Sequence, residues 1–413
     1  MEAKMVDHLF RHQYGKMVAV YTRVFGLAHL ETIEDAVQDT FVKATLQWRQ
    51  TFPDNPEAWL MRAARNRIID LLRKIKSDQD RERRMISGPA ALEIREIFLD
   101  HEVEDSQLRM IFVACHPVLS REEQIAFALR TISGFSMKEV ATALLMKDDT
   151  IKKRLQRARK TMVAREVKLV YPEPAEVPTR MAAVMQVIYL IFNEGFHSTK
   201  AEQLINRDLC GEAIRLAQLL LKKEQFRSGA LYALFALMCF HAARLESKIG
   251  PQGEIVDLAH QDRTRWYMPL ILLGNDALAR SADYPDWSAY HYEAAIAGQH
   301  VRAIRFADTD WAQILKLYQK MNAQYPGDPG RLNLAMVHLQ LEQFTEAKAA
   351  LDAIDASGLG RRAYLLHGGY AEYHFQRGDV GAARSALETA IALATNELER
   401  AYLRQKMARI SGT

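Results

Sequence analysis

The sequence predicts an all-α protein, and three observations support that prediction. Apolar residues recur at spacings of three and four along nearly all of the 413-residue chain, which is the period of an amphipathic helix. Glycine and proline, the residues that interrupt helices, number only 20 and 12. Apolar residues make up 49% of the chain, enough for two or three helical cores at this length. We therefore expect two small helical domains followed by a large one.

Breaks in composition give the expected domain boundaries. The charge-rich stretch after residue 76 contains Ser87, Gly88 and Pro89, and three prolines lie between residues 171 and 178. Neither stretch can continue as a regular helix. The predicted segments are a helical domain over residues 1–76, a linker over 77–104, a second helical domain over 105–170, and a large helical domain over 179–413.

Charge is distributed unevenly between the two parts of the chain. Residues 1–170 hold 29 Lys/Arg against 24 Asp/Glu, a net charge of +5, whereas residues 171–413 hold 26 against 27, a net charge of −1. A basic N-terminal part joined to a neutral extension indicates a nucleic-acid-binding module. The first residues lack an apolar core of a signal peptide, and no run is long and apolar enough for a membrane helix, so we expect a cytoplasmic protein with no membrane partner.

The sequence offers no pattern typical of a catalytic or metal site. Cys115, Cys210 and Cys239 lie far apart in apolar helical contexts, which predicts buried thiols in a reducing compartment. The 13 histidines form no HExxH motif and no paired CxxC motif is present, so we expect no metal and no cofactor. Without a nucleophile–base pair or a phosphate-binding loop, we expect the protein not to be an enzyme.

The stretch SMKEVATALLMKDDTIKKRLQRARK, residues 136–160, reads as a helix-turn-helix with a strongly basic second helix. A preceding helix is expected to start after Ser120, with Glu123 completing a capping box. Ala141 is small enough to let the two helices cross closely. The turn is predicted near residues 145–147, and Asp148 or Asp149 is predicted to cap the second helix.

The second helix divides into an apolar face and a polar face. Ile151 and Leu155, four residues apart, are predicted to face the core. Basic side chains on the other face suit DNA phosphates, while Arg or Gln can also reach base edges. The candidate DNA-binding residues are Thr150, Lys152, Lys153, Arg154, Gln156, Arg157 and Arg159. The alternative interpretation is a solvated basic face on a structural helix.

A second motif lies upstream of the helix-turn-helix. IEDAVQDTFVKA, residues 33–44, is followed by PEAWLMRAARNRIIDLLRK, residues 56–74. From Trp59 to Lys76 there are six cations and one acid, Asp70. A basic helix with an aromatic residue near its start suits melted or single-stranded DNA. The alternative for Trp59 is a core tryptophan.

In this order and spacing, the two motifs resemble the sigma-70 family of bacterial RNA polymerase sigma factors, in particular the short extracytoplasmic-function (ECF) type. The resemblance covers residues 5–165 and rests on EDAVQDTF, on the WLMRAARN helix, and on the EVA and TIKKRLQRAR segments of the helix-turn-helix. It implies a region 2 domain at 1–76 that binds core polymerase and recognises the −10 element. It likewise implies a region 4 domain at 105–170 that recognises the −35 element.

The resemblance assigns roles to individual positions. It implies that an acidic and apolar helix docks on the β′ clamp helices of the polymerase, with the β flap as a second polymerase contact. The implied polymerase-binding residues are Glu34, Asp35, Val37, Gln38, Asp39 and Phe41. The implied −10 residues are Trp59, Arg62, Arg65, Asn66 and Arg73, with the loop 49–56 holding a flipped base. The implied −35 residues are the candidate DNA-binding residues already named on the basic helix.

The C-terminal part carries an internal repeat. Residues 333–351 align with residues 369–387 at a spacing of 36, so that Ala335 matches Ala371, Ala347 matches Ala383, and Leu351 matches Leu387. Small residues at fixed places between two amphipathic helices are typical of tetratricopeptide-like (TPR-like) hairpins. Similar hairpins are predicted at 208–245 and 287–325. The alternative is an ordinary helical bundle.

This extension resembles a subgroup of the same family, on the segments CHPVLS, YLIFNEGF, DLAHQDRTRW and YHYEAAIAGQH. The polar run from Asp257 to Trp266 is either an effector or partner site or a network that closes the helical array. We expect a sigma factor that binds core RNA polymerase and promoter DNA and is regulated in cis by residues 179–413, with an unidentified regulatory protein as a further possible partner. The alternative is a helix-turn-helix transcriptional regulator with a C-terminal protein-interaction or ligand-sensing domain.

Overall fold

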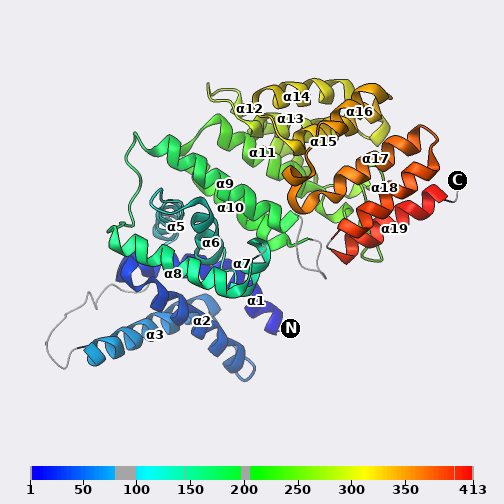
Figure 1. The fold of residues 1–413 in the computed structure, drawn as a ribbon. Coiled ribbons are helices and arrows are strands. Elements are labelled where there is room, and N and C mark those ends of the chain that lie inside the picture. The colour runs from blue at the N-terminus through cyan, green and yellow to red at the C-terminus, as the bar shows by residue number, and fades with distance from the viewer. Residues whose placement is uncertain (1, 80–98, 145, 197–204, 395, 412–413) are drawn as a thin grey trace. The chain divides into compact units, whose positions relative to one another are not determined.

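The protein is described here from a computed structural model (Figure 1). The model describes residues 2–79, 99–144, 146–196, 205–394 and 396–411. Within these ranges the chain consists of helices and their connections, and the one β-type pairing is an isolated bridge between Ile249 and Ile255. The predicted all-α class is confirmed. None of the helices described is both long and apolar enough to cross a bilayer.

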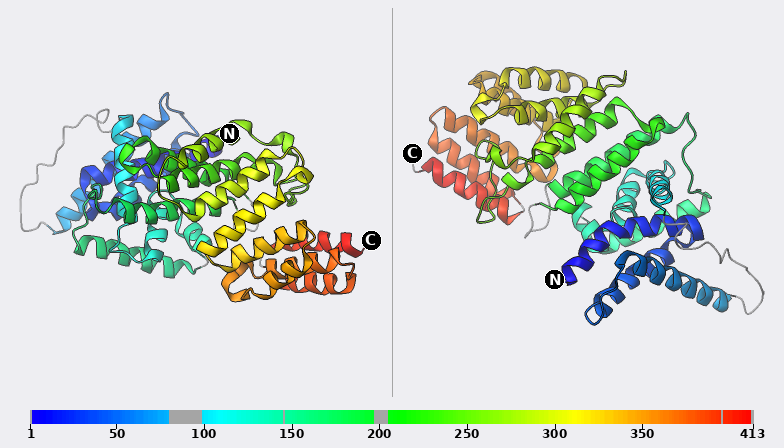
Figure 2. Two further views of the ribbon diagram at one scale, coloured as in Figure 1. Left: turned by 90° about the horizontal axis from the view of Figure 1, so that it is seen from above. Right: turned by 180° about the vertical axis from the view of Figure 1, so that it is seen from behind.

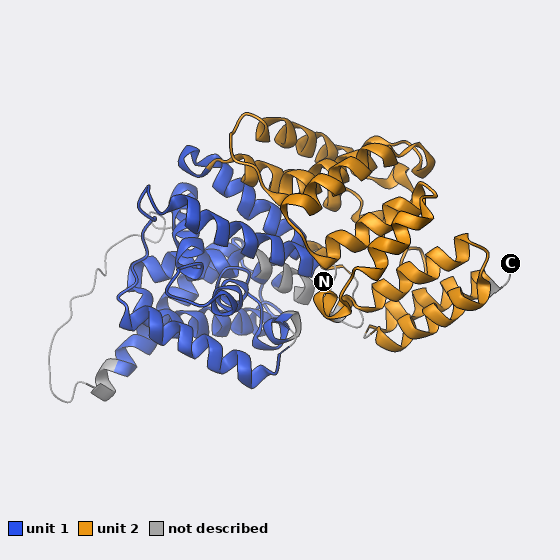
Figure 3. Cartoon of the chain, turned by 45° about the horizontal axis from the view of Figure 1, so that its top comes forward, with its two compact units in different colours: residues 1–195, 208–226 blue, residues 196–207, 227–413 orange. Residues whose placement is uncertain are grey.

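The chain forms two compact units, which Figure 3 colours separately. The first comprises Met1–Gly195 and Asp208–Phe226, and the second comprises Phe196–Arg207 and Arg227–Thr413. The predicted division after residue 178 therefore does not coincide with the division into compact units. The reason is that two helices beyond residue 176 pack with the N-terminal part of the chain.

The first unit begins with three helices: α1 (Glu2–Phe25), α2 (Leu30–Gln47) and α3 (Pro56–Gln79). A 3₁₀ turn, η1 (Leu27–His29), joins α1 to α2. α2 packs against both α1 and α3, burying Ile33, Val37 and Leu60. The loop predicted over 49–56 lies between α2 and α3, and α3 starts at Pro56, whose fixed φ suits the first turn of a helix.

In the described residues from 99 onward, the next helices are α5 (Asp100–Ala114), α6 (Arg121–Thr131), α7 (Met137–Leu144) and α8 (Asp148–Ala164). The predicted linker 77–104 is helical at both of its described ends, since α3 reaches Gln79 and α5 starts at Asp100; residues 80–98 and the Ser87-Gly88-Pro89 motif lie outside the described residues. α1 packs on α5 and touches α6. A Cβ atom on Gly15 would lie 2.1 Å from the carbonyl oxygen of Ile132, so glycine is needed for this approach.

The proline-containing stretch is non-helical up to Glu176, as predicted. It leads into α9 (Val177–Phe196) and α10 (Arg207–Lys222), followed by η2 (Glu224–Phe226). These elements contact α5. The Arg180 guanidinium donates to the carbonyl oxygen of Phe112, Arg215 donates to Gln107 at 3.2 Å, and the Phe112 and Phe226 rings lie 4.9 Å apart.

The second unit contains the remaining α-helices. They are α11 (Gly229–Ala243), α12 (Met268–Ser281), α13 (Ala289–Arg302), α14 (Trp311–Gln324), α15 (Asp328–Gln340), α16 (Phe344–Asp352), α17 (Tyr364–Gln376), α18 (Val380–Leu393) and α19 (Glu397–Ser411). Consecutive helices pack against each other from α11 to α19, and α17, α18 and α19 lie side by side in Figure 2.

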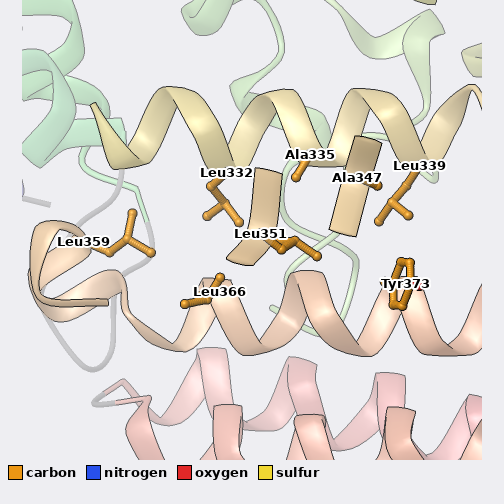
Figure 4. Packing of buried hydrophobic residues seen from close by; sticks show 8 residues of the cluster. All are labelled: Leu332, Ala335, Leu339, Ala347, Leu351, Leu359, Leu366 and Tyr373. Carbon is orange, nitrogen blue, oxygen red and sulfur yellow. The ribbon is translucent and has the colours of Figure 1, made fainter. Parts of the chain in front are cut away.

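The internal repeat of the sequence is also a repeat of structure. α15 and α16 form one hairpin, and α17 and α18 form the next. All six matched alanine and leucine residues of the repeat are fully buried. Figure 4 shows Ala335, Ala347 and Leu351 between the two helices of the first hairpin and the start of the second. The 36-residue spacing therefore places equivalent residues in the core of each hairpin.

Only one of the two earlier hairpins forms. Residues 287–325 contain α13 and α14, which pack against each other as predicted. The prediction for 208–245 is wrong, because α10 belongs to the first compact unit and α11 to the second. The amphipathic pattern identifies both helices correctly but does not specify which neighbour covers the apolar face of α10.

Candidate nucleic-acid and polymerase interface

Side chains cap the N-termini of two helices in this region, α6 and α7. Ser120 caps α6 and accepts from the Glu123 amide at 3.3 Å, while the Glu123 carboxylate accepts from the Ser120 amide at 2.9 Å, so the predicted capping box is confirmed. Ser136 and Glu139 make the same exchange at the start of α7. The predicted cap of α8 is wrong: Lys147 holds the cap position.

Asp148 and Asp149 instead lie in the first turn of α8. Their carboxylates still lie at the positive end of the helix dipole, where negative charge is stabilising. The predicted turn near residues 145–147 agrees with the gap between α7 and α8, although residue 145 is outside the described residues. Val140 and Ala141 are buried where α7 meets α8.

α8 separates its residues by face as predicted. Ile151, Leu155 and Ala158 are fully buried and hold α8 against α6 and α7. Five of the candidate DNA-binding residues are exposed, namely Thr150, Lys152, Lys153, Gln156 and Arg157. They form a basic surface with hydrogen-bonding groups suited to phosphates and base edges. Arg154 is half-buried at the edge of this surface.

Arg159 points elsewhere. Its guanidinium forms an ion pair with Glu34 of α2 and lies 3.4 Å from Glu31. Glu34 is 1% exposed, accepts from the Thr131 hydroxyl at 3.0 Å, and lies 4.0 Å from the Arg130 guanidinium. A buried carboxylate needs such partners, because leaving it unpaired would cost several kcal/mol. The structure therefore joins a candidate polymerase-binding residue to candidate DNA-binding residue Arg159.

The six candidate polymerase-binding residues on α2 fall into two groups. Glu34, Val37 and Phe41 are buried, whereas Asp35 and Asp39 are exposed and Gln38 is half-buried. Asp39 accepts from Arg67 of α3 at 2.8 Å. Only the second group is accessible to a partner in this arrangement.

Sequence reasoning missed two members of the exposed face of α2. Val42 and Leu46 are each 61% exposed and continue the line of Asp35 and Asp39. Their spacing of four, three and four residues places all four on one helix face. That spacing is visible in the sequence and could have identified them. We call the four residues the α2 stripe.

The candidate −10 residues lie along α3. Arg62, Asn66 and Arg73 are exposed, Arg65 is half-buried, and Trp59 is half-buried at the start of the helix. The Trp59 ring meets the Trp48 ring edge-on at 5.4 Å, and Trp48 meets Phe52 in the same way at 5.2 Å. Phe52, in the predicted base-holding loop, is 40% exposed. Trp59 is thus neither a fully buried core residue nor a free one, and Phe52 offers an aromatic face that sequence reasoning did not single out.

The polar run from Asp257 to Trp266 forms structural contacts. The Arg263 guanidinium donates to the carbonyl oxygens of His300 and Ala303, both at 2.6 Å, at the end of α13. The Trp266 indole donates to the Ser247 hydroxyl at 2.8 Å. These bonds make Arg263 and Trp266 part of a network that closes the helical array.

The three cysteines are buried free thiols, as expected. Burial raises the pKa of Cys115 and of Cys239 to about 12, which keeps both thiols protonated at neutral pH. Across the part of the chain that the structure describes, no group of three His, Cys, Asp or Glu side chains has a geometry suited to a metal ion.

These features define a class: a helical protein that combines an acidic and apolar stripe, a basic helix with aromatic neighbours, and a helix-turn-helix. Family models agree with each part. Residues 9–77 match sigma-70 region 2, residues 109–162 match sigma-70 region 4, and residues 180–282 match a family of unknown function, DUF6596. The chain belongs to the sigma-70 family of sigma factors.

Two relatives illustrate the extent of the similarity. An uncharacterized protein of Rhizobium meliloti, R00370, is 33% identical over 394 residues, covering 92% of this chain and 90% of that protein, so both belong to one family along nearly their full lengths. The ECF RNA polymerase sigma factor SigE of Mycolicibacterium smegmatis is 26% identical over 164 residues, covering 38% of this chain and 59% of SigE. No solved structure matches the chain.

Proposed function

We propose that this protein is a sigma factor of the ECF type that binds core RNA polymerase in the cytoplasm and directs promoter recognition and melting, without catalysing a covalent change. The observation that carries the proposal is the presence, in one chain, of the accessible α2 stripe, the basic α3 and the helix-turn-helix. A simple repressor needs only the last of these. The similarity to SigE over the first part of the chain supports the ECF type.

Each surface suits one partner. The α2 stripe combines two carboxylates with two aliphatic side chains, which fits a protein such as the β′ clamp helices rather than DNA. Arg62, Asn66 and Arg73 on α3, with Trp59 and Phe52 nearby, suit the melted −10 element. The exposed face of α8 suits the major groove of the −35 element.

The packing of region 2 on region 4 supports a resting state. Elements named −10 and −35 lie about 25 base pairs apart, or roughly 85 Å along B-DNA. Placed end to end, α3 and α8 would span about 60 Å. They cannot read both elements while α1 packs on α5 and α6. We infer that the Glu34–Arg159 contact opens when the protein acts.

Regulation by the C-terminal part is proposed to work through α9 and α10. These helices follow region 4 in the chain and contact α5, and the chain continues from them into the second compact unit, so the sequence links the TPR-like hairpins to region 4 through α9 and α10. Support for the TPR-like character comes from the matched, buried positions of the two hairpins. In this proposal, a regulatory protein that binds those hairpins supplies the signal.

Transcription assays with purified core polymerase test the proposal. The full chain should bind core polymerase and start transcription at defined promoters, which start-site mapping would identify. Asp39→Arg and Val42→Asp should each weaken polymerase binding at least tenfold, roughly 1.4 kcal/mol or more. Asp70→Arg, the same charge reversal on an exposed position of α3, is the matched control. Promoter binding without any polymerase binding would instead support the helix-turn-helix regulator.

Removing residues 227–413 tests regulation and keeps the first compact unit whole. If this shortened chain supports the same promoter-specific transcription as the full chain, the second unit does not regulate. Truncation at residue 178 is less informative, because it uncovers Phe112 on α5 and is expected to destabilise region 4 itself.

A further inference from the structure

The second compact unit contains a cavity of about 390 Å³ that the sigma-factor function does not use. Helices α15, α17 and α19 and the segment 248–255 line it. This volume lies within the range of small-molecule sites in proteins. Its apolar lining includes Ile249, Ile255, Leu332, Met336, Leu365 and Leu403.

A glycine in the middle of α17 faces this cavity. Glycine inside a helix costs about 1 kcal/mol relative to alanine, so its presence needs a reason. A Cβ atom on Gly368 would meet nothing within 4 Å, so packing does not require glycine there. The neighbouring Gly369 differs, because its Cβ would approach Leu351 at 3.0 Å. Gly368 lines the cavity, and a side chain at that position would occupy space that is now open.

A second cavity of about 550 Å³ adjoins the first. The two share four lining residues, Asn333, Met336, Tyr402 and Lys406. The second is more polar, with Asp257, His260, Glu372 and Arg409 on its wall. Together they provide an apolar chamber that continues into a polar one, which matches a molecule with an apolar body and a polar end.

The charged groups around the apolar chamber already have partners. The Lys406 ammonium lies 2.6 Å from Glu372, and Lys248 donates to the carbonyl oxygen of Phe196 at 2.8 Å. Glu399 accepts from the Tyr364 hydroxyl, an interaction that adds to burial in raising the pKa of Tyr364. A ligand entering this chamber would therefore need no charge of its own, and an ionised one would be desolvated without a free counter-ion.

We propose that the second compact unit binds a small uncharged amphiphile, with its apolar body against Gly368 and its polar end near Asn333 and Tyr402. The Tyr402 hydroxyl donates to Asp257 at 3.3 Å and the Asn333 amide bonds the Tyr318 hydroxyl, but the Tyr402 oxygen can still accept from an alcohol or amide group and the Asn333 amide retains a second N–H and its carbonyl oxygen. This site lies in the second compact unit, whereas the surfaces assigned to polymerase and DNA lie in the first.

Fluorescence titration of the full chain with N-phenyl-1-naphthylamine, an uncharged apolar probe, tests the proposal. The probe should bind saturably at one site per chain. Gly368→Leu, which fills the chamber, should weaken its affinity at least tenfold. Gly211→Leu is the matched control, since Gly211 is also a helical glycine with open space at Cβ but lines neither cavity. The affinity of this variant for the probe should stay within twofold of that of the parent chain.

Competition identifies the chemistry of the ligand. At pH 7.5, decan-1-ol should displace the probe at concentrations at least tenfold lower than decanoate. Gly368→Ala provides a second variant. It should raise the melting temperature, because alanine favours the helix, and it should lower the affinity for the probe less than Gly368→Leu does. Unchanged probe affinity in Gly368→Leu would overturn the site, and equal displacement by decanoate would overturn the uncharged ligand.

Discussion

Region 4 is held on two sides by surfaces of opposite chemistry. Towards region 2, beside the packing of α1 on α5 and α6, it presents an ionic face, made by Arg130, Thr131 and Arg159 around Glu34. Towards η2 and the segment after α8 it presents an aromatic face, in which Phe112, Tyr171 and Phe226 lie with ring centroids 4.9 to 6.3 Å apart.

The difference indicates which contact opens. Charges that separate into water regain their hydration, so an ion-paired face can part at modest net cost. Aromatic rings that separate expose apolar surface with no compensation. We therefore expect region 4 to move together with α9 and α10, and to leave region 2 when the promoter is bound.

The largest expected effect comes from the aromatic face. Phe226→Ala should lower the free energy of unfolding by about 3–5 kcal/mol, because the Phe226 ring is fully buried against Phe112 and Tyr171. Urea denaturation followed by circular dichroism measures the change. Phe52→Ala, which removes a 40% exposed ring, is the control and should cost far less. A loss below 1 kcal/mol in Phe226→Ala would mean that the aromatic face is not a permanent contact.

Removing a charge from the ionic face should have a smaller effect than removing the Phe226 ring from the aromatic face. Glu34→Gln removes the carboxylate from the buried Arg130 and the half-buried Arg159 and should favour separation of regions 2 and 4 by about 3 kcal/mol. Energy transfer between labels on Gln47→Cys and Lys168→Cys, both at exposed positions, should fall as the faces part. Glu31→Gln is the control, since Glu31 is 62% exposed and its pairing with Arg159 contributes little.

A double-mutant cycle between Glu34→Gln and Arg159→Gln measures how much the Glu34–Arg159 ion pair contributes to holding regions 2 and 4 together. The two changes should not be additive, because each removes the same ion pair. Additive effects would show that the pair does not hold the ionic face together.

Substitutions on the exposed surface of α8 should weaken DNA binding and leave the ionic and aromatic faces of region 4 intact. Lys152→Ala and Arg157→Ala should each lower promoter affinity by about 1–3 kcal/mol if the side chains reach bases. Fluorescence anisotropy at one fixed salt concentration measures the affinity. Lys168→Ala, an exposed lysine beyond α8, should have little effect. Promoter-dependent transcription that survives the combined substitution would remove α8 from the DNA interface.

The smallest effect concerns Asp105, which accepts from Tyr171 at 2.5 Å and from Arg109 at 2.7 Å. Burial alone would raise the pKa of Asp105, but these hydrogen bonds outweigh it and the pKa is lowered. A lowered pKa adds stability above the unfolded value of about 3.9 and loses it as the pH falls further. Asp105→Asn should therefore be less stable than the parent chain by about 1 kcal/mol at pH 7. Denaturation at a series of pH values should show this difference shrinking below pH 4; a constant difference would contradict it.

Most of the helix-turn-helix could be predicted from local pattern. Ser120 with Glu123, and Ile151 with Leu155, follow rules of spacing that act within one or two helical turns. The cap of α8 was wrong because three polar residues, Lys147, Asp148 and Asp149, compete at the helix start, and local sequence favours an aspartate. Val42 and Leu46 were missed although their spacing is local, because an apolar residue on a helix is more often buried.

Local sequence patterns specify the helices, the alanine and leucine positions buried within the repeat hairpins, and the basic face of α8, since all of these depend on residues within a few turns of one another. Two facts depend on the tertiary structure: Glu34 meets Arg159, 125 residues away, and α10 contacts α5 of region 4. An amphipathic helix specifies which face is covered but not what covers it, and an ion pair forms only when separate elements bring both charges to the same place.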